Sequence, residues 1–191
     1  AAAGQSDFQR LAEKELVYTG LTRTPLMALA GSVPFLGKRV GVMAEHFATS
    51  ADIHRLGGSL PEDADLLPAA DGGGKTQADS ARRLARMVGC DVEDAEMAAW
   101  RELARYFIAR QEERLFDACR EVTARAGLGA QAPVIGAGSG RSVIEGLAKK
   151  LQRPYRDFAE LLPPGTYDRE QAAMCAPAVA VARLGLDAFQ S

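Results

Sequence analysis

Hydrophobic residues recur every three to four positions over most of the second half of this chain, and this period predicts helices. The longest run of the pattern extends from about residue 93 to residue 124, and a shorter one covers residues 76–88. The segment QAAMCAPAVAVARLGLDAF is expected to form a closing helix that is kinked or restarted at Pro177. Residues 76–191 are therefore predicted to be mainly helical.

Shorter apolar runs separated by turn residues predict strands within residues 15–47. Residues 16–18 are expected to form one strand, and VPFLGKRVGVMAE has the pattern of a β-hairpin with its turn near Gly37 and Lys38. A hairpin followed by helix, strand, helix and strand suggests a mixed sheet flanked by helices. The expected fold class is therefore α/β.

A glycine-rich turn at residues 134–141 joins a short apolar strand to an amphipathic helix. The missing side chains of Gly136, Gly138 and Gly140 let backbone amides approach an anionic or planar ligand at a helix N-terminus. The spacing is G-x-G-x-G, with Arg141 where the third glycine of a G-x-G-x-x-G fingerprint would stand, so a Rossmann site fits poorly. The segment alone is compatible with a ligand cradle and with a plain strand-to-helix turn.

A long loop rich in glycine, proline and aspartate covers residues 57–75. It ends in AADGGGKT, but Ala69 stands where a Walker A loop needs its first glycine. Asp71 and Lys75 are candidates for substrate binding, with Lys75 directed at a phosphate. The alternative is a solvated surface loop without a ligand.

Both histidines of the chain lie in AEHFATSADIHR, where Thr49 or Ser50 is expected to cap a short helix. Glu45 and His46 are candidates for a catalytic acid/base pair, because an imidazole titrates near neutral pH and a carboxylate can orient it. The alternative is a strand-end histidine bonded to backbone, and His54 is expected at the surface. No H-x-x-x-H spacing or nearby cysteine indicates a metal site.

The segment ELVYTGLTRTPL concentrates hydrogen-bond donors around a glycine. Arg23 can clamp a carboxylate or phosphate with its planar guanidinium, and Tyr18, Thr19 and Thr24 can bind the same group. These four residues are predicted to bind substrate. The alternative is that this segment is an ordinary capped connection between secondary-structure elements, which explains the same spacing equally well.

Composition narrows the classes of partner. The chain of 191 residues carries 23 Lys and Arg against 25 Asp and Glu, a net charge of −2, which disfavours nucleic acid and anionic membranes as partners. Its three cysteines are far apart and form no C-x-x-C pair, as expected for reduced thiols. No apolar run of about 18 residues and no signal-peptide pattern is seen, so a cytoplasmic location is expected.

The blocks YTGLTRTPLMALA, VMAEHFATSADIHRL, LPEDADLLPAADGGGKT and VIGAGSGRSVIEGLAKKL share their order and spacing with one family. Over nearly all of residues 7–160 the chain resembles the hydantoinase/oxoprolinase-like family of tetrahydromethanopterin-linked one-carbon-transfer pathway proteins. The resemblance implies an actin-like ATPase lobe of the ribonuclease H-like kind, in the superfamily of actin, sugar kinases and heat-shock chaperones.

The resemblance also implies a nucleotide site. Gly136, Gly138, Ser139 and Gly140 would form the adenosine side of a cleft that binds ATP with Mg²⁺. The D-x-G-(G/S)-T-T turns that bind phosphate in the superfamily are absent from residues 1–191, which implies a single C-terminal lobe whose N-terminal lobe is missing. ATP and Mg²⁺ would then require that lobe or another chain, and this lobe alone would be inactive.

The family includes an enzyme of methanofuran biosynthesis that joins a furan diphosphate to glutamyl-tyramine. The resemblance therefore implies an ATP-dependent condensing transferase that acts on a small substrate with anionic groups. Two alternatives stay open: an ATP-dependent hydantoinase/oxoprolinase-type amide hydrolase, and a non-catalytic nucleotide-binding or assembly module. The partners expected are the missing lobe or another chain, and a homodimer is compatible with the sequence.

Overall fold

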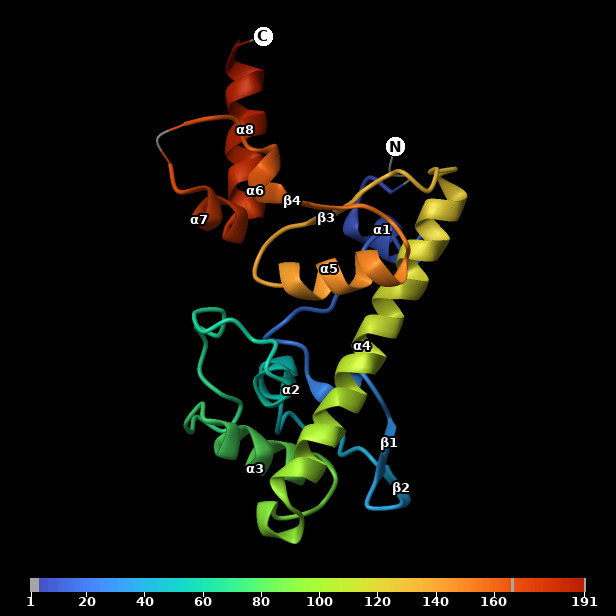
Figure 1. The fold of residues 1–191 in the computed structure, drawn as a ribbon, viewed down its shortest axis with the longest axis vertical. Coiled ribbons are helices and arrows are strands. Elements are labelled where there is room, and N and C mark those ends of the chain that lie inside the picture. The colour runs from blue at the N-terminus through green and yellow to red at the C-terminus, as the bar shows by residue number, and fades with distance from the viewer. Residues whose placement is uncertain (1–3, 166, 191) are drawn as a thin grey trace. The chain divides into compact units, whose positions relative to one another are not determined.

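The computed structural model describes residues 4–165 and 167–190, and the chain divides into two compact units, Ala1–Val122 and Thr123–Ser191 (Figure 1). Each unit contains helices and one small sheet. The coarse α/β class is therefore correct. The predicted actin-like lobe and its missing partner lobe stay predictions.

Among the residues described, four α-helices belong wholly or mainly to the first unit: α1 (Asp7–Ala12), α2 (Ser50–Gly57), α3 (Gln77–Met87) and α4 (Met97–Arg125), which continues past residue 122. Two short 3₁₀ helices cover Leu26–Ala28 and Val92–Asp94. The helices predicted from the 3.6-residue period at 76–88 and 93–124 are confirmed, with starts that are later by one and about four residues.

The predicted hairpin is confirmed as β1 (Ser32–Phe35) paired antiparallel with β2 (Lys38–Gly41). Leu36 and Gly37 make the connection with φ values of 46° and 74°, which is the backbone that a tight two-residue hairpin turn needs. The strand expected at residues 16–18 is wrong, because these residues have no ladder partner and lie in irregular backbone. A strand needs a neighbouring edge, which local propensity cannot supply.

The core of the first unit forms where β1, α2, α3 and α4 bring apolar side chains together. Trp100 of α4 stacks on Phe35 of β1 with a centroid distance of 4.8 Å, and its indole N–H donates to the carbonyls of Val92 and Ala95 at 3.0 and 3.1 Å. Other fully buried members are Leu26, Val33, Ile53, Leu84, Met87, Leu103 and Phe107. This core holds α2 and α3 side by side.

In the second unit β3 (Val134–Gly136) pairs in parallel with β4 (Tyr155–Asp157), and α5 (Arg141–Lys150) connects them. Three helices follow: α6 (Phe158–Leu161), α7 (Arg169–Met174) and α8 (Ala176–Gln190). The predicted restart near Pro177 is confirmed, because α8 begins one residue before this proline. In the first turn the missing proline N–H costs no helical hydrogen bond.

The expected single mixed sheet is not what the described residues form. They contain two separate two-stranded sheets, one in each unit. The strands have only three or four residues. Within the described part of the chain, no helix has the length and hydrophobicity needed to cross a membrane.

Candidate functional site

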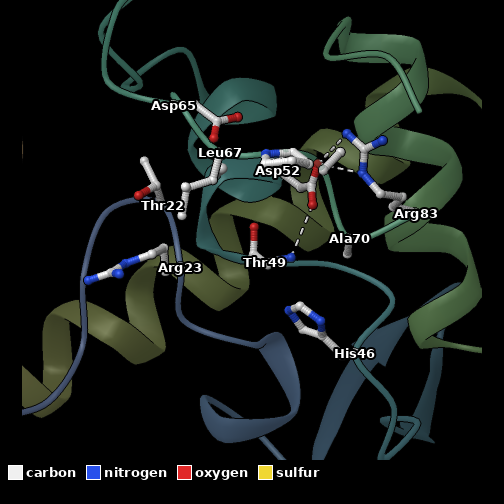
Figure 2. Close-up of a pocket in the computed structure, with 12 residues that line it drawn as sticks. Thr22, Arg23, His46, Thr49, Asp52, Asp65, Leu67, Ala70 and Arg83 are labelled. Atoms are coloured by element: carbon white, nitrogen blue, oxygen red, sulfur yellow. Dashed lines mark hydrogen bonds and ion pairs between the residues drawn. The ribbon is translucent and has the colours of Figure 1, made fainter. Parts of the chain in front are cut away.

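A pocket of about 270 Å³ lies at the N-terminal end of α2 in the first unit (Figure 2). Figure 2 shows Asp65 and Leu67 at one end of this pocket and His46 at the other. The segments that line it come from four places in the sequence: residues 22–23, 46–52 and 65–70, and Arg83 of α3. The core packing of α2 against α3 brings these segments together.

The backbone amides at the start of α2 are all engaged within the protein. Thr49 caps the helix in a capping box: its N–H donates to Asp52 Oδ2 at 3.0 Å, and the Asp52 N–H donates back to the Thr49 carbonyl at 3.0 Å. The Ser50 N–H donates to the Thr24 carbonyl at 2.8 Å. A ligand in this pocket therefore meets side chains rather than free helix amides.

Asp52 and Arg83 form a buried ion pair in the pocket floor, with only 3% and 1% of these residues exposed. Asp52 Oδ1 accepts from Arg83 Nε at 2.9 Å, from Arg83 Nη2 at 2.7 Å and from Ser80 Oγ at 2.8 Å. Burial alone lowers the pKa of Arg83, but Asp52 and Asp71 outweigh it and raise that pKa above its ordinary value. Both charges in the floor are thus neutralised.

The long loop at 57–75 is tied down on both sides of the pocket. Arg55 of α2 donates from Nη2 to Asp65 Oδ2 at 2.5 Å, and Lys75 Nζ donates to the Asp65 carbonyl at 2.7 Å. Arg83 donates from Nη1 to Asp71 Oδ1 at 3.0 Å. The loop is irregular, as predicted, but these contacts attach it to α2 and α3.

The two loop residues predicted to bind substrate, Asp71 and Lys75, therefore serve the loop itself. The ammonium of Lys75 faces Asp65, and Asp71 binds Arg82 as well as Arg83. Burial opposes the charge of Asp71, but the Gly73 amide and the two guanidinium groups hold its pKa below the ordinary value. Neither side chain lines the pocket.

Arg23 and His46, predicted from separate motifs, line the same pocket. Both are exposed, and neither has a hydrogen bond or ion pair with any residue that the structure describes. The alternative of a histidine bonded to backbone therefore does not hold for His46 in that part of the chain. In Figure 2 the guanidinium of Arg23 points away from His46. Each group can therefore engage a ligand without breaking a hydrogen bond or ion pair within the described residues.

The predicted pairing of Glu45 with His46 is not formed. Glu45 is exposed and does not line the pocket, and no hydrogen bond joins the two side chains among the described residues. The Glu45 carbonyl instead accepts from the Phe47 N–H at 2.9 Å in a tight turn. Consecutive residues in this turn do not bring their side chains together.

Three other residues predicted to bind substrate serve local structure or lie elsewhere. Thr19 and Thr24 join their hydroxyl groups at 3.1 Å, and Thr24 Oγ1 also accepts from the Gly20 N–H at 2.8 Å. The Thr24 N–H donates to Ser50 Oγ at 3.1 Å. Tyr18 is 82% exposed and borders a different surface hollow. The two threonines form the ordinary capped connection that was the alternative for this segment.

His54 is a correction, because it was expected at the surface and is only 1% exposed. Its Nε2 lies 2.9 Å from Gln111 Oε1, and its Nδ1 lies 2.7 Å from Ser59 Oγ. The Gln111 amide donates to the Gly20 carbonyl at 2.9 Å, so its oxygen must accept from His54 Nε2–H. Burial lowers the pKa of His54, since the charged imidazole loses its hydration.

Sequence reasoning missed the roles of Asp52, Arg83 and Asp65 in this pocket. One local signal was available: TSAD, residues 49–52, has the T-x-x-D spacing of a capping box. That spacing places Asp52 at the start of α2. No local signal indicates Arg83 as its partner, because the contact spans 31 positions.

The predicted nucleotide turn lies in the second unit, and the fold itself uses two of its glycines. A Cβ on Gly136 would lie 2.3 Å from the Tyr155 hydroxyl, so the ring occupies the space that a side chain would need. Gly138 has φ +76°, and its N–H donates to the Ala173 carbonyl at 2.9 Å. Gly140 faces open space.

The charge beside this turn is also engaged. Arg141 binds both carboxylate oxygens of Asp157 at 3.1 Å and forms an ion pair with Glu170. Burial disfavours the charge of Asp157, but the Ala159 amide and Arg141 hold its pKa below the ordinary value. Ser139 is half-buried. The turn therefore offers no free cation for a phosphate, and a nucleotide role for it stays a prediction.

Among the residues that the structure describes, no group of three or more His, Cys, Asp or Glu side chains has a geometry that could hold a metal ion.

Comparison with known proteins places the chain in a family. The sequence profile of the hydantoinase/oxoprolinase family matches residues 1–185, which is nearly the whole chain. The chain belongs to the hydantoinase/oxoprolinase family. The resemblance seen in the sequence blocks is thereby confirmed.

Two curated relatives are both named (4-{4-[2-(gamma-L-glutamylamino)ethyl]phenoxymethyl}furan-2-yl)methanamine synthase. The protein of Methanocaldococcus jannaschii is 35% identical over 91 residues, which cover 48% of this chain and 28% of the relative. That of Methanococcus vannielii is 29% identical over 92 residues, which cover 48% of this chain and 41% of the relative. The matched region thus spans less than half of each curated relative.

Proposed function

We propose that the protein carrying this chain is an enzyme of one-carbon cofactor biosynthesis of the methanofuran type, and that it condenses two small substrates. The observation that carries this proposal is the 35% identity to a synthase of the furan-2-yl methanamine named above. The pocket at α2 supports it, because it presents Arg23 and His46 without partners among the described residues.

The relatives' product name defines the bond that such an enzyme forms. A phenoxymethyl group is an aryl ether, in which a phenol oxygen is bonded to a methylene on the furan. The ether forms when the phenol oxygen attacks a methylene that carries a leaving group. The bond from the methylene to the leaving group breaks, the leaving group keeps the electron pair, and the phenol proton passes to a base. With a diphosphate leaving group, the second product is diphosphate.

The pocket residues can serve both sides of this reaction. Arg23 would bind the oxygens of an anionic leaving group, since a guanidinium offers two parallel donors to a phosphate. His46 would accept the phenol proton, because a neutral imidazole acts as a base near neutral pH. Asp52 and Asp65 do not oppose the anion, since Arg83 and Arg55 neutralise them.

Nucleotide chemistry is a separate part of the proposal. ATP with Mg²⁺, held in part by the turn at residues 136–140, is supported only by the resemblance to actin-like enzymes. No residue of the pocket at α2 requires it. The proposed ether synthesis therefore includes no nucleotide step.

The test is formation of the ether product by the full-length protein, followed by mass spectrometry. Arg23→Ala should raise KM for the anionic substrate about tenfold or more, the usual effect of losing hydrogen bonds from a charged group. His46→Ala should lower kcat by about 10²-fold or more. Arg86→Ala is the matched control, because Arg86 is exposed on α3 and does not line the pocket.

Ether formation at the wild-type rate by both pocket variants would contradict the assignment of the site. If no ether forms and the protein instead opens a hydantoin or oxoproline ring, the hydrolase alternative is the correct one.

A further inference from the structure

Five consecutive apolar residues, 66–70, lie between the two anchored aspartates of the long loop. We call this segment, Leu-Leu-Pro-Ala-Ala, the apolar strap. Its last four residues line the pocket at α2, whereas Leu66 is 84% exposed and does not. The strap therefore supplies a continuous apolar part of the pocket lining.

The strap is held at both ends by charged contacts that lie outside it. Asp65 pairs with Arg55, and their side chains are only 12% and 14% exposed. Asp71 pairs with Arg83 of α3. A turn closes the far end, where the Gly72 N–H donates to the Ala69 carbonyl at 2.9 Å. Fixed ends and a proline in the middle restrict the conformations of the strap before any ligand arrives.

Most of the rest of the pocket lining is polar. Thr22, Arg23 and His46 contribute polar groups, and Thr49 adds another at the start of α2. Leu67 is 50% exposed, so it keeps apolar surface that a ligand can cover. At about 270 Å³ the pocket suits a small ligand or one part of a larger one.

We propose that the apolar strap determines specificity in this pocket by selecting anions that carry a small flat apolar group, with Leu67 as the main contact. Asp65 and Asp71 are positioning residues that hold the strap in place. The inference rests on the proposed function because it uses the same pocket, but it concerns ligand choice and requires no particular reaction.

The experiment compares phenyl phosphate with inorganic phosphate, both titrated calorimetrically into the full chain. The wild type should bind phenyl phosphate about tenfold more tightly, as expected when a ring covers half a leucine side chain. Leu67→Ala should remove most of this preference and leave the Kd for inorganic phosphate unchanged. Leu66→Ala is the matched control and should behave like the wild type.

Two further variants separate the strap from the anion site. Arg23→Ala should weaken both ligands by a similar factor. Asp65→Asn should reduce the preference for phenyl phosphate, as Leu67→Ala does, without changing the Kd for inorganic phosphate. A general loss of structure would instead weaken both ligands together.

Each remaining outcome is decisive. Equal preference for phenyl phosphate in Leu67→Ala and in the wild type would overturn the strap proposal while leaving the anion site intact. Binding of phenyl phosphate that depends on Leu67 but not on Arg23 would support the strap and contradict the proposed anion site. If neither ligand binds, the anion site at Arg23 and the strap proposal are both wrong.

Discussion

Replacing Asp52 with asparagine removes one charge from the buried ion pair with Arg83 while keeping the size of the side chain. The carboxylate accepts four hydrogen bonds: two from Arg83, one from Ser80 Oγ and one from the Thr49 N–H. An amide has only one acceptor atom. If that oxygen stays with Arg83, the amide NH₂ faces the Thr49 N–H, so two donors oppose each other in a partly buried place.

The cost follows from this geometry. A buried donor left without an acceptor costs about 1–3 kcal/mol, and the two Arg83 bonds fall from charge-assisted to weaker ones, at about 1 kcal/mol each. The sum is about 3–5 kcal/mol, the range seen when one partner of a buried ion pair is removed. Asp71 still pairs with Arg83, which favours the lower end. A protein of ordinary stability would lose a large part of its roughly 5–15 kcal/mol.

Urea unfolding followed by tryptophan fluorescence measures this loss. Trp100 is the only tryptophan of the chain and is buried in the first unit, so it reports on the unit that contains Asp52. Asp63→Asn is the matched control, because Asp63 is exposed and has no hydrogen bond or ion pair among the described residues, and it should change the free energy of unfolding by less than about 0.5 kcal/mol.

A loss below about 1 kcal/mol in Asp52→Asn would refute the reasoning, since it would mean that Arg83 does not depend on this carboxylate. A double variant supplies a second test. Asp52→Leu with Arg83→Met should be more stable than either single change, because no uncompensated charge stays buried.

Two predictions concern other parts of the chain. Because burial lowers the folded pKa of His54 below its ordinary 6.5, the unfolded chain takes up the proton first. The contribution of neutral, buried His54 to the free energy of unfolding is therefore fully present above pH about 6.5. This contribution falls with decreasing pH, by at most about 1.4 kcal/mol per pH unit. Unfolding titrations from pH 7.5 to 5.5 should show a shallower slope in His54→Gln, and equal slopes would contradict the assignment. Gly136→Ala should destabilise the second unit by about 1–3 kcal/mol, because its Cβ would meet Tyr155 at 2.3 Å. Gly140→Ala is the control, because the space around its Cβ is open, and it should change the thermal unfolding temperature very little. Both variants are measured by thermal unfolding followed by circular dichroism. Equal effects of the two substitutions would show that Tyr155 does not fill the space beside Gly136.

Local sequence patterns identified most elements of the fold correctly. The long helix α4 follows from its 3.6-residue period, and the hairpin turn follows from a glycine between two apolar runs. The capping box of α2 could be read from four consecutive residues. Residues 16–18 show the limit of such patterns, since a strand depends on a partner that local sequence does not specify.

In the candidate site too, single residues could be predicted from local sequence, whereas the contacts between distant residues could not. Arg23 and His46 were predicted from their own segments, as a guanidinium in a donor-rich turn and an imidazole at an expected strand end. Their meeting in one pocket depends on the packing of α2 against α3 and on the anchored loop. The same packing buried His54 against Gln111, a contact across 57 positions.

The family, the helices and the hairpin could be predicted from the sequence, because they depend on matched blocks, short-range periodicity and turn chemistry. Which charged residues are free and which are engaged became known only from the tertiary structure. Lys75 and Asp71 carry charges that suggested ligand binding, yet each is paired within the protein. The reason is physical: an ion pair depends on distance in space, and the pair of Asp52 with Arg83 joins residues that are 31 positions apart.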